Sequence, residues 1–334
     1  IALLAVGCST PAPAPAPAPA PGPAPAPAPA PAWIPEQPIT IYSHYGVGSS
    51  YDMYPRGLSP IVSKYLGQGY QHVIADVKPG SDGVLGTTYV FNAKPDGYTL
   101  GCIDMAKMVT YNMVRDVPFN YEEFTYITAP ALGHFVLAVA ADSPINSIDD
   151  LRAAGEINPI RVVCGSAGRN ELIPFAALDI KHTFVTGYRG GPTLVGGILK
   201  GEGDVLTVGD TMLMPFFLSG DMKPIMSYGT ERNPLLLKNG FDIPCSAELG
   251  AHELDNLVSI IAIVAPPGTP PEIASVLESA FMKAYQDPEG ITWAEEANLP
   301  IAEAMNGAEA REAMNMIWDL FYPWRDLLDQ HMAK

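Results

Sequence analysis

The chain has 334 residues, a formal net charge of -17 and 16% charged residues. The acidic excess argues against a nucleic-acid-binding protein, whose surface would be basic. An anionic small ligand is still compatible with it, because backbone amides and helix ends attract anions without carrying a formal charge. The low share of charged residues is not that of a disordered polyelectrolyte. From residue 33 onward the chain is long enough for two domains that each bury a core.

The first 36 residues are predicted to precede the fold. Residues 1–8 resemble the end of a bacterial lipoprotein signal, in which the cysteine, here Cys8, is lipidated. The charged start of such a signal is missing, so we expect the sequence to begin inside it. Residues 9–36 form a linker in which 11–32 are almost pure Pro-Ala alternation. We expect this linker to be an extended spacer of roughly 70 Å that lifts a folded domain off a membrane.

The first folded stretch is predicted to be a strand, a small-residue turn and a helix. Residues 39–44 alternate as in a strand, and Gly46-Val47-Gly48-Ser49-Ser50 interrupts the alternation. Apolar residues at helical spacing follow from Met53. Free backbone N–H groups would then meet the positive end of a helix dipole, which makes an anion site.

This strand–turn–helix pattern recurs, which predicts parallel sheets covered by helices. Strands are expected at 71–77 and 100–103, and the pattern restarts at 161–164, where the turn 165–168 opens a helix. The strands 135–141 and 223–227 are expected to join two lobes. We therefore predict an α/β fold in which residues 37–135 form the first part of lobe 1, 136–227 form lobe 2, and 228–334 complete lobe 1 with C-terminal helices.

Few residues point to catalysis or to a metal. The sequence has no Gly-x-Ser-x-Gly elbow, no His-Glu-x-x-His and no Walker loop. The six histidines do not have the spacing of metal ligands. Cys102, Cys164 and Cys245 are far apart in sequence and most simply belong to the core. We expect no metal, no cofactor and no transmembrane helix.

Three Gly/Ser turns at strand ends share a different chemistry. The turns 48–50, 80–83 and 165–168 offer backbone N–H groups, and several add hydroxyls. Neutral donors of this kind suit a carboxylate, and a ligand with two anionic ends could bridge two turns. The alternative is that these are the ordinary βα turns of any α/β protein, and the turns alone would favour it.

The order and surroundings of the turns change that judgement. From about Ile39 onward, the chain resembles the periplasmic substrate-binding proteins of tripartite tricarboxylate transporters, also called Bug receptors. Six motifs carry the resemblance in order: Gly48-Ser49-Ser50-Tyr51-Asp52 with Arg56, Pro79-Gly80-Ser81-Asp82-Gly83, the Pro-Asp-Gly-Tyr-Thr-Leu of 95–100, the Gly-Ser-x-Gly of 165–168, Tyr188-Arg189-Gly190-Gly191, and the Ala-Pro-x-Gly-Thr-Pro of 265–270.

The resemblance implies a type II periplasmic-binding fold, with two α/β lobes joined by two crossing strands and a ligand cleft between them. It implies a monomeric, periplasmic receptor that captures a mono-, di- or tricarboxylate and delivers it to membrane permease subunits, with no catalysis. Carried over residue by residue, it places Ser49, Ser50, Ser166, Ala167 and Gly168 at the ligand. The further ligand-binding candidates are Gly48, Tyr51, Asp52, Asp104, Asn170 and Asp210.

Departures from the family pattern leave two questions open. Asp82 stands where glycine is usual, and Asp104 falls where small hydroxyl residues are common. Either both acids face away from the ligand, or the ligand carries an amine, hydroxyls or a bound cation. Arg169 meets the far end of the ligand or is a solvated helix residue. A ligand-sensing module for a sensor kinase and, less directly, a periplasmic enzyme are the alternative functions.

Overall fold

The computed structural model of the chain describes residues 33–67, 72–165, 167–188 and 191–332. Ala32–Lys334 is one compact unit. Cys8, nearly all of the predicted linker and Ser166 lie outside the described residues. In the described part of the chain, no helix has both the length and the apolar character needed to cross a membrane.

Lobe 1 is built on a mixed sheet with the strand order β10-β4-β9-β3-β1-β2. The parallel strands are β1 (Ile39–Ser43), β2 (Val73–Val77) and β3 (Thr99–Asp104). Three antiparallel strands extend the sheet: β9 (Val258–Ala265), β4 (Thr125–Ala140) and β10 (Met305–Asn306). The apolar side chains of β1 and β3 are buried because helices cover both faces of this sheet.

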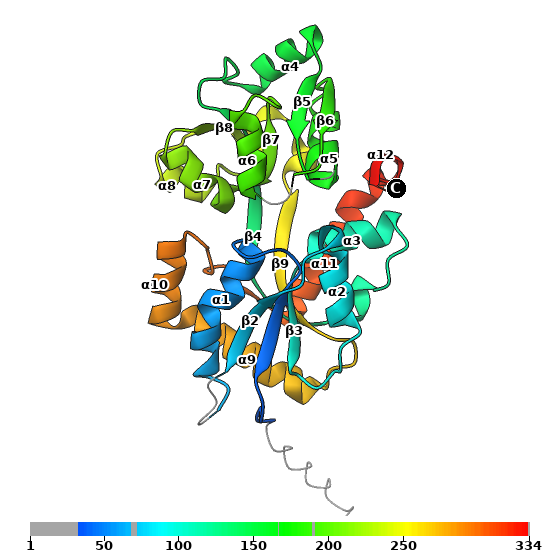
Figure 1. Ribbon diagram of the computed structural model, residues 1–334, viewed down its shortest axis with the longest axis vertical. Helices are drawn as coiled ribbons and strands as arrows, with labels where there is room; N and C mark the ends of the chain where they lie inside the picture. The colour runs from blue at the N-terminus through cyan, green and yellow to red at the C-terminus, as the bar shows by residue number, and fades with distance from the viewer. Residues whose placement is uncertain (1–32, 68–71, 166, 189–190, 333–334) are drawn as a thin grey trace, which may run out of the picture. The chain divides into compact units, whose positions relative to one another are not determined.

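Two sets of helices provide that cover (Figure 1). On one side lie α1 (Ser50–Ser63), α9 (Pro271–Gln286) and α10 (Pro288–Ala297), which share a hydrophobic cluster with β1. On the other side lie α2 (Val84–Phe91), α3 (Met105–Val114) and α11 (Gly307–Phe321). The last long helix is interrupted at Pro323: α11 ends at Phe321, a short 3₁₀ turn contains the proline, and α12 (Arg325–Met332) follows.

Lobe 2 uses the second half of β4. Residues 135–140 of that strand pair with β7 (Leu206–Gly209) and β8 (Met222–Ser227), while β5 (Ile160–Val163) and β6 (His182–Val185) form a parallel pair beside them. The helices of lobe 2 are α4 (Ile148–Ile157), α5 (Arg169–Ala177), α6 (Gly191–Leu199), α7 (Asp210–Leu218) and α8 (Pro234–Lys238). The predicted α/β fold with two lobes is confirmed.

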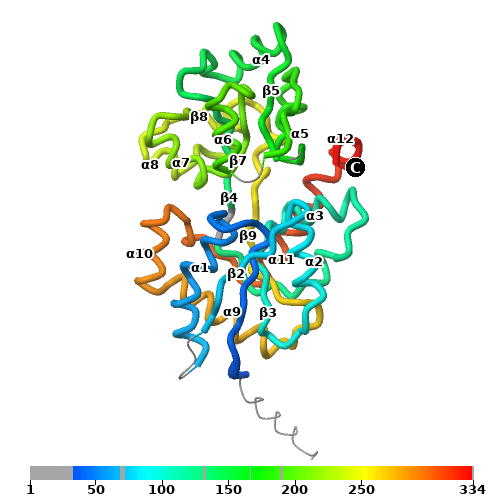
Figure 2. The backbone as a smooth tube through the Cα atoms, in the orientation of Figure 1, coloured from blue at the N-terminus to red at the C-terminus, as the bar shows by residue number. Residues whose placement is uncertain are grey.

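The connections between the lobes differ from the expected pair of strands. The strand predicted at 135–141 is the end of β4, which begins at Thr125. This strand tolerates Pro130 because its pairing with β9 shifts register between Thr128 and Ala131, where the proline lies. Residues 223–227 belong to β8 inside lobe 2. The second crossing strand is β9, which starts opposite His134 (Figure 2).

Lobe 2 consequently continues beyond the expected boundary at residue 227. Ser227 bridges to Cys245, and Leu236 packs in the lobe 2 core. Asn233 bonds the carboxylate of Asp210 at the start of α7. Residues 228–257 are therefore part of lobe 2, and the chain returns to lobe 1 with β9.

A glycine in α2 sets how closely this helix approaches the end of β1. A Cβ at Gly86 would lie 2.5 Å from the Lys78 carbonyl oxygen and 2.9 Å from the His44 Cα, both of which are backbone atoms. We expect Gly86→Ala to lower the free energy of unfolding by about 1–3 kcal/mol, because backbone must move to accept the methyl group. Urea denaturation measures the change.

Gly196 in α6 is the matched control, because a Cβ there meets nothing within 4 Å. Gly196→Ala should raise the free energy of unfolding by about 0.5–1 kcal/mol through helix propensity alone. Equal effects of the two substitutions would contradict the tight packing of α2 on β1.

Candidate functional site

The carboxyl ends of β1 and β3 are joined by a buried histidine. His44 follows β1, and its Nε2 accepts a hydrogen bond of 2.9 Å from the backbone N–H of Asp104 at the end of β3. The other ring nitrogen, Nδ1, lies 3.3 Å from the Thr87 hydroxyl oxygen. Burial lowers the pKa of His44 to about 4, so the ring is neutral at physiological pH. His44 is a positioning residue that sequence reasoning missed.

The first small-residue turn is largely closed on itself. Ser49 N and Oγ both donate to the Gly46 carbonyl, and Gly48 N–H donates to the Asp52 carboxylate at 3.0 Å. Gly48 has a φ of 84°, a conformation that suits glycine. Asp52 is buried and also pairs with Arg56 at 2.6 Å. The Asp52 carboxylate therefore has its partners inside this turn and helix.

The start of α1 keeps donors for a ligand. Among the described residues, the backbone N–H groups of Ser50 and Tyr51 have no acceptor. The Tyr51 hydroxyl lies 2.5 Å from Ser259 Oγ on β9, and its ring packs against His44 and Tyr45. The positive end of α1 thus lies beside an aromatic cluster that touches a crossing strand.

The unexpected acid of the second turn has its own partners in lobe 1. Asp82 has a φ of 54°, the left-handed region where glycine is usual. Its carboxylate lies 2.6 Å from Lys107 Nζ and accepts a bond of 2.6 Å from the Tyr111 hydroxyl, both from α3. Lys107 also donates to the Tyr45 hydroxyl at 3.1 Å. Asp82 therefore adds no uncompensated charge.

The unexpected acid after β3 meets an arginine from lobe 2. Asp104 caps α3 by accepting from Lys107 N, and its Oδ1 lies 3.5 Å from Arg169 Nη2 at the start of α5. Arg169 is only 2% exposed and also donates to the Val258 carbonyl at 3.3 Å. The alternative of a solvated Arg169 is therefore wrong. Arg169 joins lobe 2 to the lobe 1 sheet.

Several polar atoms at the start of α5 have no partner among the described residues. These are the Arg169 Nε and the Asn170 Oδ1, both buried, and the backbone N–H groups of the same two residues. Gly168 N–H donates to Glu171 Oε2 at 3.0 Å, which closes the first turn of the helix. Ala167 and Gly168 precede this helix, as the sequence predicted, while Ser166 is not described.

Asp210 lies apart from this group in the described contacts. It begins α7, where its carboxylate accepts from Asn233 Nδ2 at 2.7 Å and from Thr211 N at 2.6 Å. Burial raises its pKa. Asp210 is thus held by lobe 2 itself. No group of described His, Cys, Asp and Glu residues has the arrangement of a metal site.

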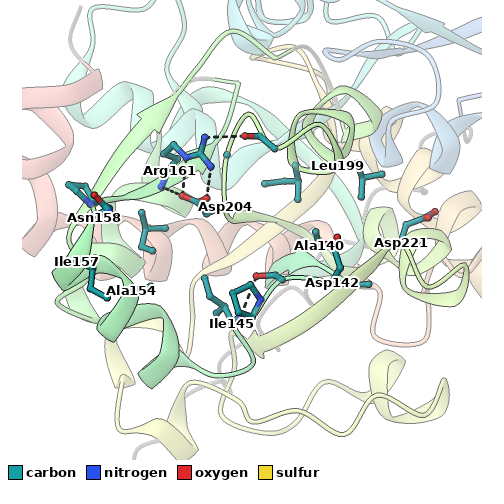
Figure 3. Close-up of a pocket in the computed structure, with 18 of the residues that line it drawn as sticks. Ala140, Asp142, Ile145, Ala154, Ile157, Asn158, Arg161, Leu199, Asp204 and Asp221 are labelled. Atoms are coloured by element: carbon teal, nitrogen blue, oxygen red, sulfur yellow. Dashed lines mark hydrogen bonds and ion pairs between the residues drawn. The ribbon is translucent and has the colours of Figure 1, made fainter.

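A cavity lies elsewhere in lobe 2. It has a volume of about 890 Å³ and is lined by Ala140, Asp142, Asn158, Arg161 and Asp204, among others (Figure 3). Arg161 and Asp204 face each other there in an ion pair of 2.7 Å. The cavity lies at the amino end of β5, whereas ligands of open α/β sheets bind at carboxyl ends. A second cavity, of about 430 Å³, is lined by Tyr121, Tyr126 and Arg311 with neighbouring residues of lobe 1.

Comparison with known proteins identifies the fold and the family. The sequence model of the tripartite tricarboxylate transporter family receptor, TctC, matches residues 56–329. The chain belongs to this family. The receptor is 31% identical to a UPF0065 protein of Cupriavidus necator over 266 residues, which cover 76% of each chain. It is 30% identical to a UPF0065 protein of Bordetella bronchiseptica over 260 residues, or 76% of the receptor and 75% of that protein.

Solved structures agree with the two-lobed fold. MatC from Rhodopseudomonas palustris, solved with malate, superposes with a TM-score of 0.74 at 19% identity over 88% of the receptor and 100% of that chain. The periplasmic binding protein BugD gives a TM-score of 0.73 at 21% identity, over 90% of the receptor and 99% of the BugD chain. The family consists of periplasmic solute-binding receptors rather than enzymes, and the TctC receptor described here is one of them.

The neutral state of His44 has a consequence for acid stability. Its pKa is about 4 in the folded receptor, against 6.5 for an unperturbed histidine. Between these values the unfolded chain binds a proton that the folded chain excludes, so stability falls as the pH falls from 6.5 to 4. In His44→Gln we expect the free energy of unfolding to fall by about 3 kcal/mol less over this pH range than in the wild type, because glutamine does not titrate.

Denaturant unfolding of both proteins at pH 7, 5.5 and 4 checks the difference. His331→Gln, at an exposed position of α12, serves as the control and should retain the wild-type slope. The same pH dependence in wild type and His44→Gln would show that another group causes the acid loss.

Proposed function

We propose that the receptor binds a small organic carboxylate between its two lobes. The observation that carries this proposal is a set of donors at two helix starts that have no acceptor among the described residues. They are the backbone N–H groups of Ser50 and Tyr51 on α1 and of Arg169 and Asn170 on α5. Helix starts of this kind attract a carboxylate through the dipole and through direct hydrogen bonds.

The proposed ligand-contacting residues follow from these two helix starts. In lobe 1 they are Gly48, Ser49, Ser50 and Tyr51, with Asp52 holding the turn, and Asp104 next to them. In lobe 2 they are Ser166, Ala167, Gly168 and Asn170, with Asp210 at the start of α7. Structural neighbours support the ligand class, since MatC was solved with malate and another Rhodopseudomonas palustris protein with adipate.

The energetics require both lobes. A hydrogen bond to a charged group contributes about 1.5–3 kcal/mol, and each helix dipole adds about 0.3–1 kcal/mol. Micromolar affinity needs about 8.2 kcal/mol. One helix start with two donors does not reach this value, whereas donors from α1 and α5 together do once water is excluded. We infer that a ligand with micromolar affinity contacts both lobes.

Delivery of the ligand to the membrane completes the proposal. The family supports a receptor that hands its ligand to the permease subunits of a tripartite tricarboxylate transporter. Residues 1–8 end in the cysteine of a lipoprotein-like signal, and the Pro-Ala linker follows directly. We infer that Cys8 carries a lipid that holds the receptor at the membrane, with the linker as spacer.

A thermal-shift screen tests carboxylate binding. The purified receptor is heated with mono-, di- and tricarboxylates of two to eight carbons, and with matched amides as uncharged controls. A carboxylate at a hundredfold excess over its dissociation constant should stabilise the folded receptor by about 2.7 kcal/mol, while its amide should not. Mass spectrometry of the molecule that co-purifies provides an independent check. Stabilisation by the amides alone, or by none of the compounds, would contradict the proposal.

Substitution of Cys8 tests the anchor. When the receptor is expressed behind a complete lipoprotein signal in a Gram-negative host, the wild type should sediment with membranes. Cys8→Ala should move to the soluble periplasmic fraction, with unchanged affinity for any carboxylate found in the screen. Persistence of the variant in the membrane fraction would contradict lipidation at Cys8, and Cys245→Ala controls for loss of a thiol elsewhere.

A further inference from the structure

The first three residues of α5 carry two unpartnered polar atoms and one acid, and they bear on the kind of carboxylate that the receptor binds. The acid, Glu171, accepts one hydrogen bond, from the Gly168 N–H. Arg169 Nε is a charged donor without an acceptor, and Asn170 Oδ1 is an acceptor without a donor; both atoms are buried. Glu171 is a half-buried acid, and no described cation lies within ion-pair distance of it. One helix turn thus offers a site for an anion beside a site for a donor-rich cation.

The arginine has a free edge that suits a carboxylate. Its Nη2 is engaged by Asp104 and the Val258 carbonyl, at 3.5 and 3.3 Å, which are long for charge-assisted bonds. The Phe135 and Phe321 rings lie 5.9 and 5.5 Å from its guanidinium carbon, which keeps the side chain away from water. Nε is the donor left over, and it can give one charge-assisted hydrogen bond to a carboxylate oxygen of the ligand.

Charge balance in the same cluster indicates what the rest of the ligand carries. Lys107 pairs with Asp82, and Arg169 pairs with Asp104, so each cation already has its own acid. Glu171 is the additional acid. A second carboxylate on the ligand would meet this surplus negative charge, whereas an ammonium group would balance it.

We propose that the ligand is an amino carboxylate, whose carboxylate binds Arg169 Nε and whose ammonium group binds Asn170 Oδ1 and Glu171. The inference rests on the proposed carboxylate-receptor function and narrows its ligand class. It explains why a carboxylate receptor has acids in its second turn and after β3: they neutralise Lys107 and Arg169, which leaves Glu171 for the ammonium group.

The protonation of Glu171 gives the proposal a distinctive readout. Burial raises the pKa of Glu171 to about 7, although the N–H of Gly168 opposes the shift. Lys107 and Arg169 also act to lower this pKa and Asp82 to raise it, and Tyr45, Tyr228 and Cys164 are the other titratable groups whose charges interact with Glu171. An ammonium group brought to Glu171 lowers its pKa and releases a proton near pH 7. A second carboxylate raises the pKa and takes up a proton.

Four probes of nearly equal size separate these cases. Succinate, malate and aspartate share one carbon skeleton and differ by a hydrogen, a hydroxyl or an ammonium group, and 4-aminobutyrate replaces one carboxylate by an amine. Calorimetric titration at pH 7, in phosphate and in Tris, gives the affinity and the number of protons exchanged. We expect aspartate or 4-aminobutyrate to bind about tenfold or more tightly than succinate and malate, with proton release.

Two conservative variants localise the effect. Glu171→Gln should abolish the proton release and reduce the preference for the amino probe by about tenfold. Arg169→Lys keeps the charge next to Asp104 but loses the Nε donor, and it should weaken binding of every probe by about tenfold. The matched controls are Glu156→Gln, at an exposed pair with Lys181, and Arg161→Lys, at the fork with Asp204 in the distant cavity. Neither control should change affinity.

Tighter binding of succinate or malate, or proton uptake with the amino probe, would overturn this inference and leave the carboxylate receptor in place. Failure of all four probes would also overturn it, and the wider thermal-shift screen would then decide the proposed function by itself. If Arg169→Lys fails to fold, the proton count of Glu171→Gln still decides the proposal, because this variant retains the Arg169–Asp104 pair.

Discussion

The two lobes share one strand, and the candidate site depends on that constraint. The first part of β4 pairs with β9 in lobe 1, and residues 135–140 of the same strand pair with β7 and β8 in lobe 2. Any movement between the lobes must bend β4 and the start of β9. Arg169 bonds the Val258 carbonyl and Tyr51 bonds Ser259, both at the start of β9. The candidate site therefore contacts the segment where the lobes move.

An acidic protein can hold an acidic ligand only through local interactions. With a net charge of -17, the long-range field repels anions, but salt screens it beyond about 8 Å at physiological ionic strength. Donors at the starts of α1 and α5 act inside that distance. Burial strengthens them further, because a hydrogen bond in a low-dielectric cleft is less weakened by water. The acidic surface is therefore compatible with anion capture.

Local patterns predicted much of this fold, and non-local pairings account for what they missed. The repeated strand–turn–helix units follow from the spacing of apolar residues and of turn residues along the chain. The second crossing strand does not, because residues 223–227 and 258–264 both form strands and only their tertiary pairing shows which of them crosses between the lobes. Asp104 looked like an unbalanced acid for the same reason: its arginine partner lies 65 positions away. Asp82, in the turn after β2, also has a partner that local patterns do not show. This partner is Lys107, in the first turn of α3 just after Asp104.

The unfilled atoms of α5 indicate why this arrangement of the lobes suits a bound ligand. A buried guanidinium loses several kcal/mol of hydration, and one pair at 3.5 Å does not restore it. The free Arg169 Nε and Asn170 Oδ1 add the cost of unmade hydrogen bonds. A ligand that satisfies these atoms stabilises this arrangement more than an open one in which water reaches them. Under the proposed function, occupancy by a ligand and closure of the lobes are coupled through the same few polar atoms.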